Sequence, residues 1–257
     1  MTWNPSLYMR FGTERTRPAL DLVMRIPDIG VRRIVDLGCG PGNSTQFLAS
    51  RWPDAAIIGV DSSPEMIAAA RKQVAHADFA VADFETWAPE TPPDVIFSNA
   101  ALHWSKDIVT LVVRLFHALA PGGVLAVQIP QNFDRPSHTI PHTMAGEALW
   151  AQKLVGARWF DPAHFPRDLT LARPLAAAGA GLDVWTTDYL HLLRGRDPVF
   201  DWAAATTLQP FMAALEPPDC AAFAAEARRR YAAAYPPEAD GATVVPFRRL
   251  FVVARRG

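Results

Sequence analysis

Short segments rich in β-branched residues alternate with helical stretches through the first half of the chain. The expected strands occupy residues 33–37, 56–61, 79–83, 94–99 and 124–129, and the stretches between them are typical of helices and turns. A strand, a helix and a second parallel strand form the repeating unit of an α/β sheet, which helices cover on both faces. The alternation therefore predicts a mostly parallel sheet with helices on either side.

The alternation stops after Pro130. Residues 184–193 and 244–254 are expected to be strands, and residues 197–235 to be largely helical. With 257 residues the chain is long enough for one large core. We therefore expect a single domain over residues 1–257, and the remaining stretches are assigned within it. Residues 1–30 form a lead-in or lid, 31–133 a ligand-binding half, and 134–183 and 196–240 a helical cap between the late strands.

Charge and composition exclude several kinds of partner. The 25 Lys and Arg residues nearly balance the 26 Asp and Glu residues, so no broad basic surface favours nucleic acid or an anionic membrane. No apolar run approaches membrane-spanning length, and the first residues lack the apolar core of a secretion signal. Cys39 and Cys220 are widely spaced, and the histidines form no ligand cluster. These features predict a cytoplasmic protein without a bound metal.

A glycine-rich run, Val35 to Gly42, follows the first expected strand. Glycines let the backbone turn sharply and approach a ligand at a helix N-terminus. A dinucleotide-binding fingerprint would have glycine where this chain has Asn43, and a carboxylate at Asp36 is unfavourable for a phosphate. The run favours a ligand with an ammonium group. The alternative is a turn that uses glycine for geometry alone.

Acidic residues end the next two expected strands as well. Asp61 ends the second strand, where a carboxylate can accept hydrogen bonds from ribose hydroxyls, although a helix N-cap would explain it equally well. Asp83 ends the third strand beside Phe84, and this pair suits the amine and the ring of an adenine. Together with Asp36, these acids mark one rim of the sheet, where open α/β sheets bind ligands.

The run VDLGCGPGNST, Asp61 and the pair Asp83–Phe84 resemble the class I S-adenosylmethionine-dependent methyltransferases over residues 31–130. The resemblance implies a Rossmann-like sheet of seven strands with an antiparallel last strand, residues 184–193 and 244–254 being strands six and seven. It implies S-adenosylmethionine as the cofactor, with the glycines at its methionine part, Asp61 at the ribose, and Asp83 and Phe84 at the adenine. The expected cofactor-binding residues are Asp36, Gly38, Gly40, Asp61, Ser62, Met66, Asp83, Phe84 and Asn99.

A closer similarity is carried by both chain ends. Residues 3–8 and 248–256, together with Asp61–Pro64, Ser98–Ala100 and Trp104, are similar to the trans-aconitate methyltransferases within that class. The similarity is weakest over residues 134–180. It implies O-methylation of a small polycarboxylate, trans-aconitate, to a monomethyl ester. A carrier-linked malonyl carboxylate, a nicotinamide-dependent dehydrogenase and a binding protein without catalysis are the alternatives; Asp36 and Asn43 disfavour the dehydrogenase.

A tricarboxylate needs local cations and donors, and guanidinium groups bind carboxylates through two hydrogen bonds. Arg248 and Arg249 are adjacent on an expected strand and point to opposite faces, so at most one of them serves the site. No catalytic acid or base is expected, because a carboxylate is already ionised at neutral pH. The expected substrate-binding residues are Trp3, Tyr8, Arg10, Arg15, Arg17, Asn132, His138, Tyr189, His191 and Arg248.

Overall fold

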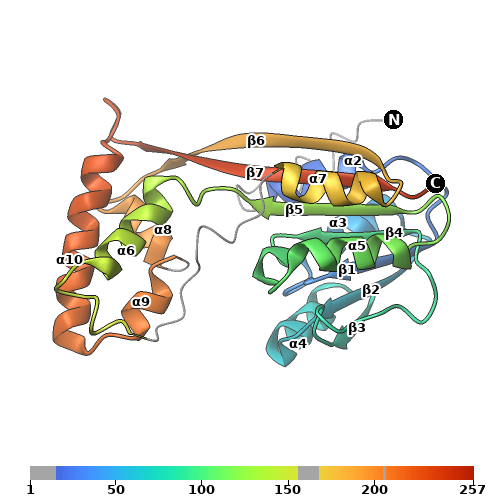
Figure 1. Cartoon of the computed structure of the whole chain (residues 1–257), viewed down its shortest axis with the longest axis horizontal. Helices are drawn as coiled ribbons and strands as arrows, with labels where there is room; N and C mark the ends of the chain where they lie inside the picture. Colours follow the sequence, from blue (N-terminus) through green and yellow to red (C-terminus); the bar gives the residue numbers. More distant parts are fainter. Residues whose placement is uncertain (1–15, 156–167, 205–206) are drawn as a thin grey trace. The chain divides into compact units, whose positions relative to one another are not determined.

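One seven-stranded sheet runs through the computed structural model, which describes residues 16–155, 168–204 and 207–257 (Figure 1). Its strand order is β3-β2-β1-β4-β5-β7-β6. Strands β1 to β5 pair in parallel, and β7 runs antiparallel to β5. The predicted fold class is therefore confirmed. The strands are β1 (Arg33–Leu37), β2 (Ala56–Asp61), β3 (Asp78–Val81), β4 (Val95–Asn99), β5 (Val124–Pro130), β6 (Gly181–Leu193) and β7 (Thr243–Arg255).

The chain divides into two compact units. The first contains the described residues of 1–130 and 166–187 together with 249–257, and the second those of 131–165 and 188–248. Strands β6 and β7 contribute residues to both units. No helix of the described residues is long and apolar enough to cross a membrane. Within the same residues, no group of three or more His, Cys, Asp or Glu side chains could hold a metal ion.

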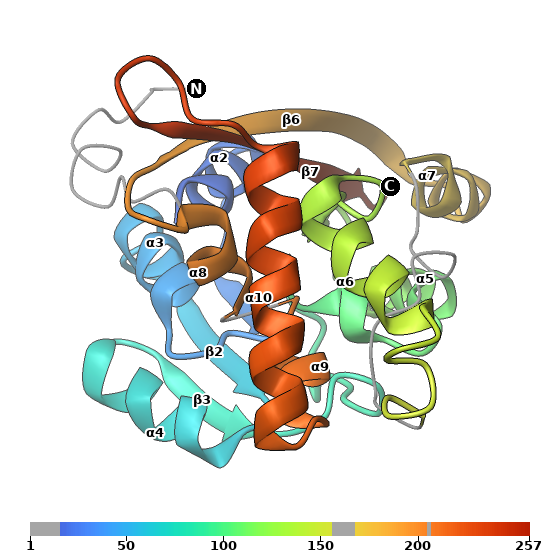
Figure 2. The same ribbon diagram turned by 90° about the vertical axis from the view of Figure 1, so that its left-hand side faces the viewer.

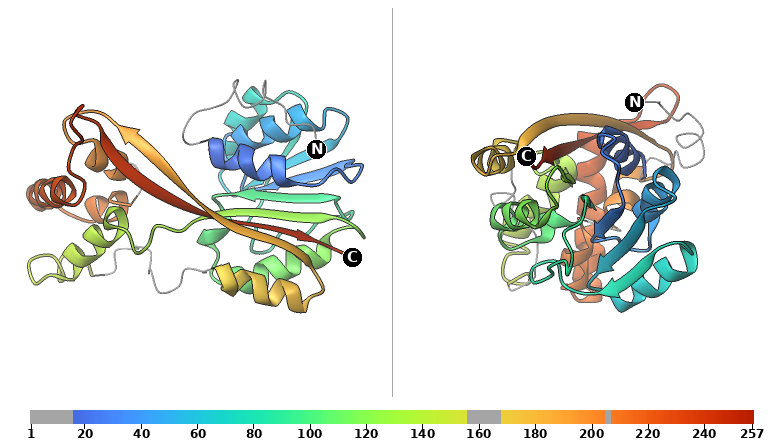
Figure 3. Two further views of the ribbon diagram at one scale, coloured as in Figure 1. Left: turned by 90° about the horizontal axis from the view of Figure 1, so that it is seen from above. Right: turned by 90° about the vertical axis from the view of Figure 1, so that its right-hand side faces the viewer.

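Helices cover both faces of the sheet in the first unit (Figures 1 and 3). One face carries α2 (Arg17–Arg25), α3 (Asn43–Arg51) and α4 (Pro64–Gln73), and the other carries α5 (Ile108–Ala118) and α7 (Asp168–Ala177). The apolar stripe of α5, including Leu111 and Leu115, packs with Ile96 and Leu125 in the main core. Because helices cover both faces, every residue of β5 is buried, as parallel strands require.

The two helices beside the ligand rim begin at side-chain caps. The hydroxyl of Ser63 accepts a hydrogen bond from the Met66 N–H at the start of α4, where Pro64 occupies the first helical position. Asp107 accepts from the Thr110 N–H at the start of α5. A short 3-10 turn, η1 (Leu102–Trp104), precedes α5. These caps fix where the loops at the carboxyl ends of β2 and β4 stop.

The second unit is helical, as the sequence predicted for residues 197–235. Helices α6 (Pro136–Gly146), α8 (Pro198–Ala204) and α9 (Gln209–Ala213) each pack against α10 (Pro217–Ala234) (Figure 2). Its core combines aromatic and aliphatic side chains, and the rings of Trp150 and Phe223 meet edge to face at 5.2 Å. Of the expected cap segments, α6 and α8 to α10 belong to this unit, whereas α7 belongs to the first.

Candidate functional site

The loop between β1 and α3 is shaped by its glycines. Gly38 and Gly40 adopt positive φ angles of 75° and 55°, which L side chains rarely occupy. A Cβ atom on Gly38 would lie 2.2 Å from the Cβ of Ala101, so no larger residue fits there. A Cβ atom on Gly40 would meet no atom within 4 Å. Gly38 is therefore required for packing, whereas Gly40 leaves open space next to the loop.

That open space is part of a pocket with a volume of about 720 Å³. The carboxyl ends of β1, β2 and β4 line it, together with the loop after β3 and the start of α2. Pockets of this size hold cofactors and small ligands. Eight of the nine expected cofactor-binding residues line it: Gly38, Gly40, Asp61, Ser62, Met66, Asp83, Phe84 and Asn99.

Asp61, at the end of β2, fixes the loops on both sides of the pocket. Its Oδ2 accepts a hydrogen bond from the Gly40 N–H, and its Oδ1 accepts one from the Ser63 N–H, both at 2.9 Å. Each carboxylate oxygen can accept a second hydrogen bond. Asp61 is partly exposed and faces the pocket, so these remaining acceptor positions are available to a ligand.

Asp36, the ninth expected residue, is fully buried and does not line the pocket. Its Oδ2 accepts hydrogen bonds from the hydroxyls of Ser44 and Thr45 at 2.8 and 2.7 Å, while its Oδ1 has no hydrogen-bond partner among the described residues. Burial raises the pKa of this carboxyl to about 6. The pattern of acids at strand ends predicted its position in the fold, but not that the start of α3 would engage it.

Asp83 and Phe84 lie in a loop that α5 holds in place. The Asp83 Oδ1 accepts from the N–H of Glu85 at 2.9 Å. The guanidinium of Arg114 donates to the carbonyl oxygens of Trp87, Phe84 and Glu85 at 2.5, 2.8 and 3.2 Å. The backbone of this loop is therefore fixed before any ligand arrives.

The end of β4 supplies polar groups of a different kind. Asn99 lines the pocket, and its Oδ1 is buried without a partner among the described residues. Ala100 has a φ of 54°, an uncommon value for a residue other than glycine. Lys106 also lines this end, next to Trp104, whose side chain is 68% exposed. The sequence analysis did not select Lys106, because a lone lysine before a helix carries no pattern.

The expected substrate-binding residues fall into three groups. Trp3, Tyr8, Arg10 and Arg15 lie outside the described residues. Arg17 is exposed at the first residue of α2, next to Thr16, which lines the pocket. The other five belong to the second unit: Asn132, His138, Tyr189, His191 and Arg248. None of these residues lines the pocket of the first unit.

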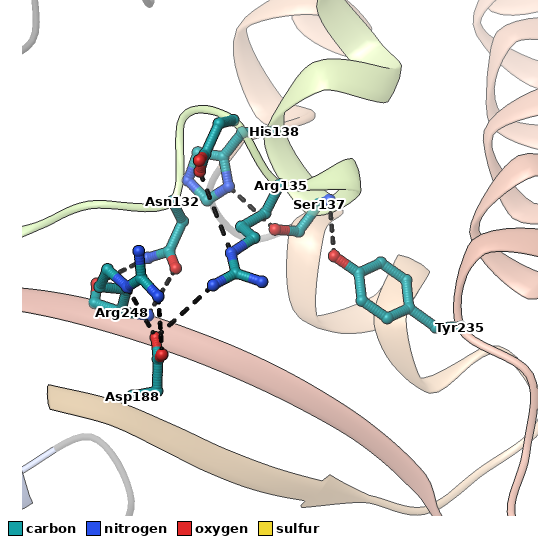
Figure 4. A network of polar contacts seen from close by, with 8 residues as sticks. Asn132, Arg135, Ser137, His138, Asp188, Tyr235 and Arg248 are labelled. Atoms are coloured by element: carbon teal, nitrogen blue, oxygen red, sulfur yellow. Dashed lines mark hydrogen bonds and ion pairs between the residues drawn. The ribbon is translucent and has the colours of Figure 1, made fainter.

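Asn132 and Arg248 form polar contacts close to Asp188 and to Arg135, an arginine that the sequence analysis missed (Figure 4). Arg248 forms a two-point ion pair with Asp188, at 3.0 and 2.9 Å, and Arg135 reaches the same carboxylate at 3.8 Å. The pKa of Asp188 is held below its usual range, chiefly by its hydrogen bonds from Arg248. The Asn132 side chain exchanges two hydrogen bonds with the backbone of Arg248.

The three remaining side chains are buried in the second unit, where the two histidines pack on aromatic rings. His138 lies 3.0 Å from the Ser137 hydroxyl through its Nδ1 and packs edge to face on Phe133. His191 packs on Phe247 at 5.7 Å between ring centroids. Tyr189 shares the β6 face of His191, as their spacing predicted, and both are less than one-tenth exposed. Burial of this kind also suits packing, so their role toward a substrate stays a prediction.

Known proteins similar to this chain decide its family. A family model described as a methyltransferase domain matches residues 34–123. A trans-aconitate 2-methyltransferase of Methylobacterium radiotolerans is 45% identical over 99% of this chain and 98% of its own length. Enzymes of the same name from Streptomyces avermitilis and Mycobacterium tuberculosis are 45% and 43% identical, each over 99% of this chain and 97% of its own length.

The chain belongs to the trans-aconitate 2-methyltransferase family. Its fold is shared more widely among S-adenosylmethionine-dependent methyltransferases. A solved structure of such an enzyme from Mesorhizobium loti has a TM-score of 0.52 at 21% identity, over 96% of this chain and all of the other. Phosphoethanolamine N-methyltransferase 2 of Haemonchus contortus, solved with S-adenosyl-L-methionine, has a TM-score of 0.53 at 16% identity, over 97% of this chain and 56% of the other.

The pocket fits the cofactor of this family. Asp61, Asp83 and Glu85 gather carboxylates at the ends of β2 and β3, which suits ribose hydroxyls, an adenine amine and a positively charged ligand. Gly40 leaves room for close approach to the loop backbone, and Asn99 lines the same pocket. The volume of the pocket, its negative charge and its hydrogen-bonding groups therefore agree with binding of S-adenosylmethionine.

Proposed function

We propose that this chain methylates a carboxylate of trans-aconitate with S-adenosylmethionine and releases a monomethyl ester. The observation that carries the proposal is the identity of about 45% with enzymes of that name over 99% of the chain. The cofactor supplies a methyl group on a positively charged sulfur. When the bond from a carboxylate oxygen to that methyl carbon forms, the carbon–sulfur bond breaks and the electron pair stays on sulfur, so no proton moves.

Different pocket residues would bind different parts of the cofactor. Asp61 would accept hydrogen bonds from the ribose hydroxyls through its remaining acceptor positions, while Gly40 stays fixed by its other bond. Asp83, Phe84 and Met66 would hold the adenine from the ends of β3 and α4. The loop at Gly38 and Gly40 would carry the methionine part. Asp36, ionised above a pH of about 6, would favour its ammonium group through the buried loop.

The same residues support a transfer without a general base. Among the described residues that line the pocket there is no histidine. Cys39 lines it, but burial raises the pKa of its thiol, which keeps it protonated at neutral pH. A carboxylate nucleophile needs no deprotonation, so the work left to the protein is alignment and exclusion of water. Alignment of this kind contributes about 7–11 kcal/mol in favourable cases.

Recognition of the acid would rest on cations near the pocket. Lys106 lines the pocket, and Arg17 directly follows Thr16, which also lines it. In the second unit Arg135 and Arg248 gather around Asp188, and guanidinium groups are suited to carboxylates. Asn132 orients the Arg248 backbone.

The test is product identification. The purified chain is incubated with methyl-labelled S-adenosylmethionine and, separately, trans-aconitate, cis-aconitate, citrate, isocitrate and a malonyl thioester, and products are identified by mass and by NMR. We expect labelled monomethyl trans-aconitate as the main product. If the malonyl thioester is esterified in preference to trans-aconitate, the proposed substrate is wrong. If calorimetry detects cofactor binding but no ester forms from any of the acids, the chain is a binding protein without catalysis.

A further inference from the structure

Gln128, in the middle of β5, is a polar residue that the cofactor pocket does not explain. It is fully buried, and among the described residues neither its Nε2 nor its Oε1 has a hydrogen-bond partner. Buried amides are nearly always paired, because an unpaired one loses its hydrogen bonds to water without replacement. An apolar residue of the same shape would be the more stable choice at this position. The amide therefore points to a role other than packing.

The register of the sheet places Gln128 beside Asn99. The two residues are Cα partners on the adjacent parallel strands β5 and β4, so their side chains lie on the same face. Asn99 reaches the pocket, and its buried Oδ1 also lacks a partner in the described part of the chain. An amide N–H of Gln128 is the donor that this oxygen needs. Two complementary groups thus lie next to each other with their hydrogen-bonding capacity unused.

The backbone ties the same two positions together. The N–H of Ala100 donates to the carbonyl oxygen of Gln128 at 2.9 Å. Ala100 is the described residue other than glycine that has a positive φ, and such strain persists where the surroundings fix it. Ala101, the next residue, contacts Gly38 so closely that no Cβ fits between them. The turn that presents Asn99 to the pocket is therefore anchored on Gln128.

The polarity of the pocket indicates which ligand Asn99 faces. Carboxylates line the end formed by β2 and the loop after β3, at Asp61 and Asp83. The β4 end carries the amide of Asn99 and the ammonium of Lys106, and the carboxylate of Glu85 is engaged there by the Lys106 N–H at 2.8 Å. Hydrogen-bond donors suit an anion, so the β4 end is the one matched to the carboxylate of the acid.

We propose that Gln128 is a positioning residue for methyl transfer, acting through Asn99. With the acid bound, the Gln128 Nε2–H donates to the Asn99 Oδ1. That bond fixes the Asn99 amide plane and directs its N–H groups toward the carboxylate that accepts the methyl group. The inference rests on the proposed function, since it assumes a carboxylate at the β4 end. It predicts that the amide of Gln128 raises kcat and lowers the thermal stability of the fold.

The experiment compares Gln128→Met, which keeps the shape of the side chain and removes the amide, with wild type. We expect an unchanged or higher Tm, an affinity for S-adenosylhomocysteine within twofold of wild type, and a kcat at least tenfold lower. Leu125→Met is the matched control, because Leu125 is buried on the opposite face of β5. That control is expected to keep its kcat. A merely structural role of Gln128 would instead lower Tm and leave kcat unchanged.

A double-mutant cycle tests the route through Asn99. If Gln128 acts through that amide, Gln128→Met adds less than a twofold loss of kcat in an Asn99→Ala background. Independent, multiplying losses would overturn the proposal, as would a Gln128→Met enzyme with wild-type kcat. Gln128→Leu repeats the comparison if the methionine variant does not fold.

A second measurement on the wild-type protein needs no variant. The side-chain amide resonances of Gln128, assigned by NMR, should shift and exchange more slowly once cofactor product and acid are both bound. Unchanged resonances in the complex would contradict the inference. If wild type forms no ester from any acid, the proposed function fails. If it forms the ester and Gln128→Met does so equally fast, only this inference fails.

Discussion

At the scale of single residues, Asp61 holds the loops on both sides of the pocket through two backbone hydrogen bonds. We predict that Asp61→Ala weakens S-adenosylmethionine binding by about 1.5–3 kcal/mol, the usual value for hydrogen bonds to a charged group. The loss has two sources, the direct contacts and the release of the Gly40 and Ser63 N–H groups that the carboxylate now holds. Calorimetric titration of cofactor and cofactor product measures it.

Asp54→Ala is the matched control for this change. It removes the same charge from an exposed turn between α3 and β2, outside the pocket lining. Asp61→Asn separates the two sources, because its single amide oxygen can still accept from one N–H group. An Asp61→Ala protein that folds and binds the cofactor as tightly as the Asp54 control would remove Asp61 from the binding site.

Asp36 predicts a pH dependence of stability. Burial raises its pKa to about 6 from an ordinary 3.8, so between about pH 4 and 6 the folded chain binds the proton more tightly than the unfolded chain does. The free energy of unfolding therefore falls as pH rises through that interval and stays low above it. Two pKa units correspond to about 3 kcal/mol. Asp36→Asn should abolish this loss and be more stable than wild type at pH 7.

Urea unfolding of both proteins from pH 4 to 7 measures the effect. Other carboxyls titrate in this range with the opposite sign, since the pKa of Asp188 and of Glu226 is lowered in the folded state. They are present in both proteins, so the difference between wild type and variant isolates Asp36. A difference in stability that stays constant with pH would show that the carboxyl titrates normally.

At the scale of elements, two glycines of the loop between β1 and α3 have different surroundings, Gly38 in a packed position and Gly40 beside the pocket. Gly30→Ala, Gly38→Ala and Gly40→Ala all place a side chain at positive φ, with an expected strain of about 1–2 kcal/mol. Gly38→Ala adds a clash with Ala101, so we predict that it lowers Tm far more than the other two. Gly40→Ala should match Gly30→Ala in Tm and lose cofactor affinity, because its methyl group enters the pocket.

Thermal denaturation and cofactor titration of the three variants test this order. Gly30 lies before β1, outside the pocket lining, and a Cβ there meets no atom within 4 Å, so it reports the backbone strain alone. Equal cofactor affinity for Gly30→Ala and Gly40→Ala would mean that the ligand does not approach this part of the loop.

The strand pattern was predictable because it depends on local features. Buried parallel strands are continuous apolar runs, and the glycine run and the acids at strand ends mark their carboxyl ends. Eight of the nine expected cofactor residues consequently line one pocket. Gln128 was not selected, because only the register of β4 and β5 places it beside Asn99, and that register is not visible in the sequence.

The substrate residues were harder to predict for the same physical reason. Arg135 follows an aspartate at the start of a helix and resembles any surface charge. Only the fold brings it to Asp188 beside Arg248, although 52 residues separate it from that aspartate. Conversely, the sequence analysis did select Asn132, after the fifth expected strand, and Arg248, in the last one. In the structure two hydrogen bonds join these residues. Ion pairs between residues that are far apart in the chain produce no repeating pattern in the sequence.

At the scale of the whole molecule, the charges are nearly balanced, so an anionic acid must be held by local groups. The first unit contains the cofactor pocket with Lys106, and the second contains the Arg135–Arg248 network. Strands β6 and β7 contribute residues to both units, so binding and turnover are properties to be measured on the full chain.

The reaction of the full chain should depend little on pH. A carboxylate acceptor with a pKa of about 4 is ionised throughout the neutral range, so no side chain must remove a proton. We predict that kcat at saturating cofactor and acid is flat from about pH 6.5 to 9, above the carboxyl range and below that of arginine. The histidines to be tested are His103, in η1, and two buried histidines of the second unit, His138 and His191.

Replacing any of these three histidines should change the KM for the acid more than it changes kcat. His103 packs on Trp104 at 4.8 Å between ring centroids, and His138 and His191 both pack on Phe247, so we expect their loss to change local packing and to remove no proton carrier. The measurement is a pH–rate series on wild type and on His103→Gln, His138→Gln and His191→Gln. A kcat limb near pH 6.5 that disappears in one variant would identify that histidine as a general base and end the base-free mechanism.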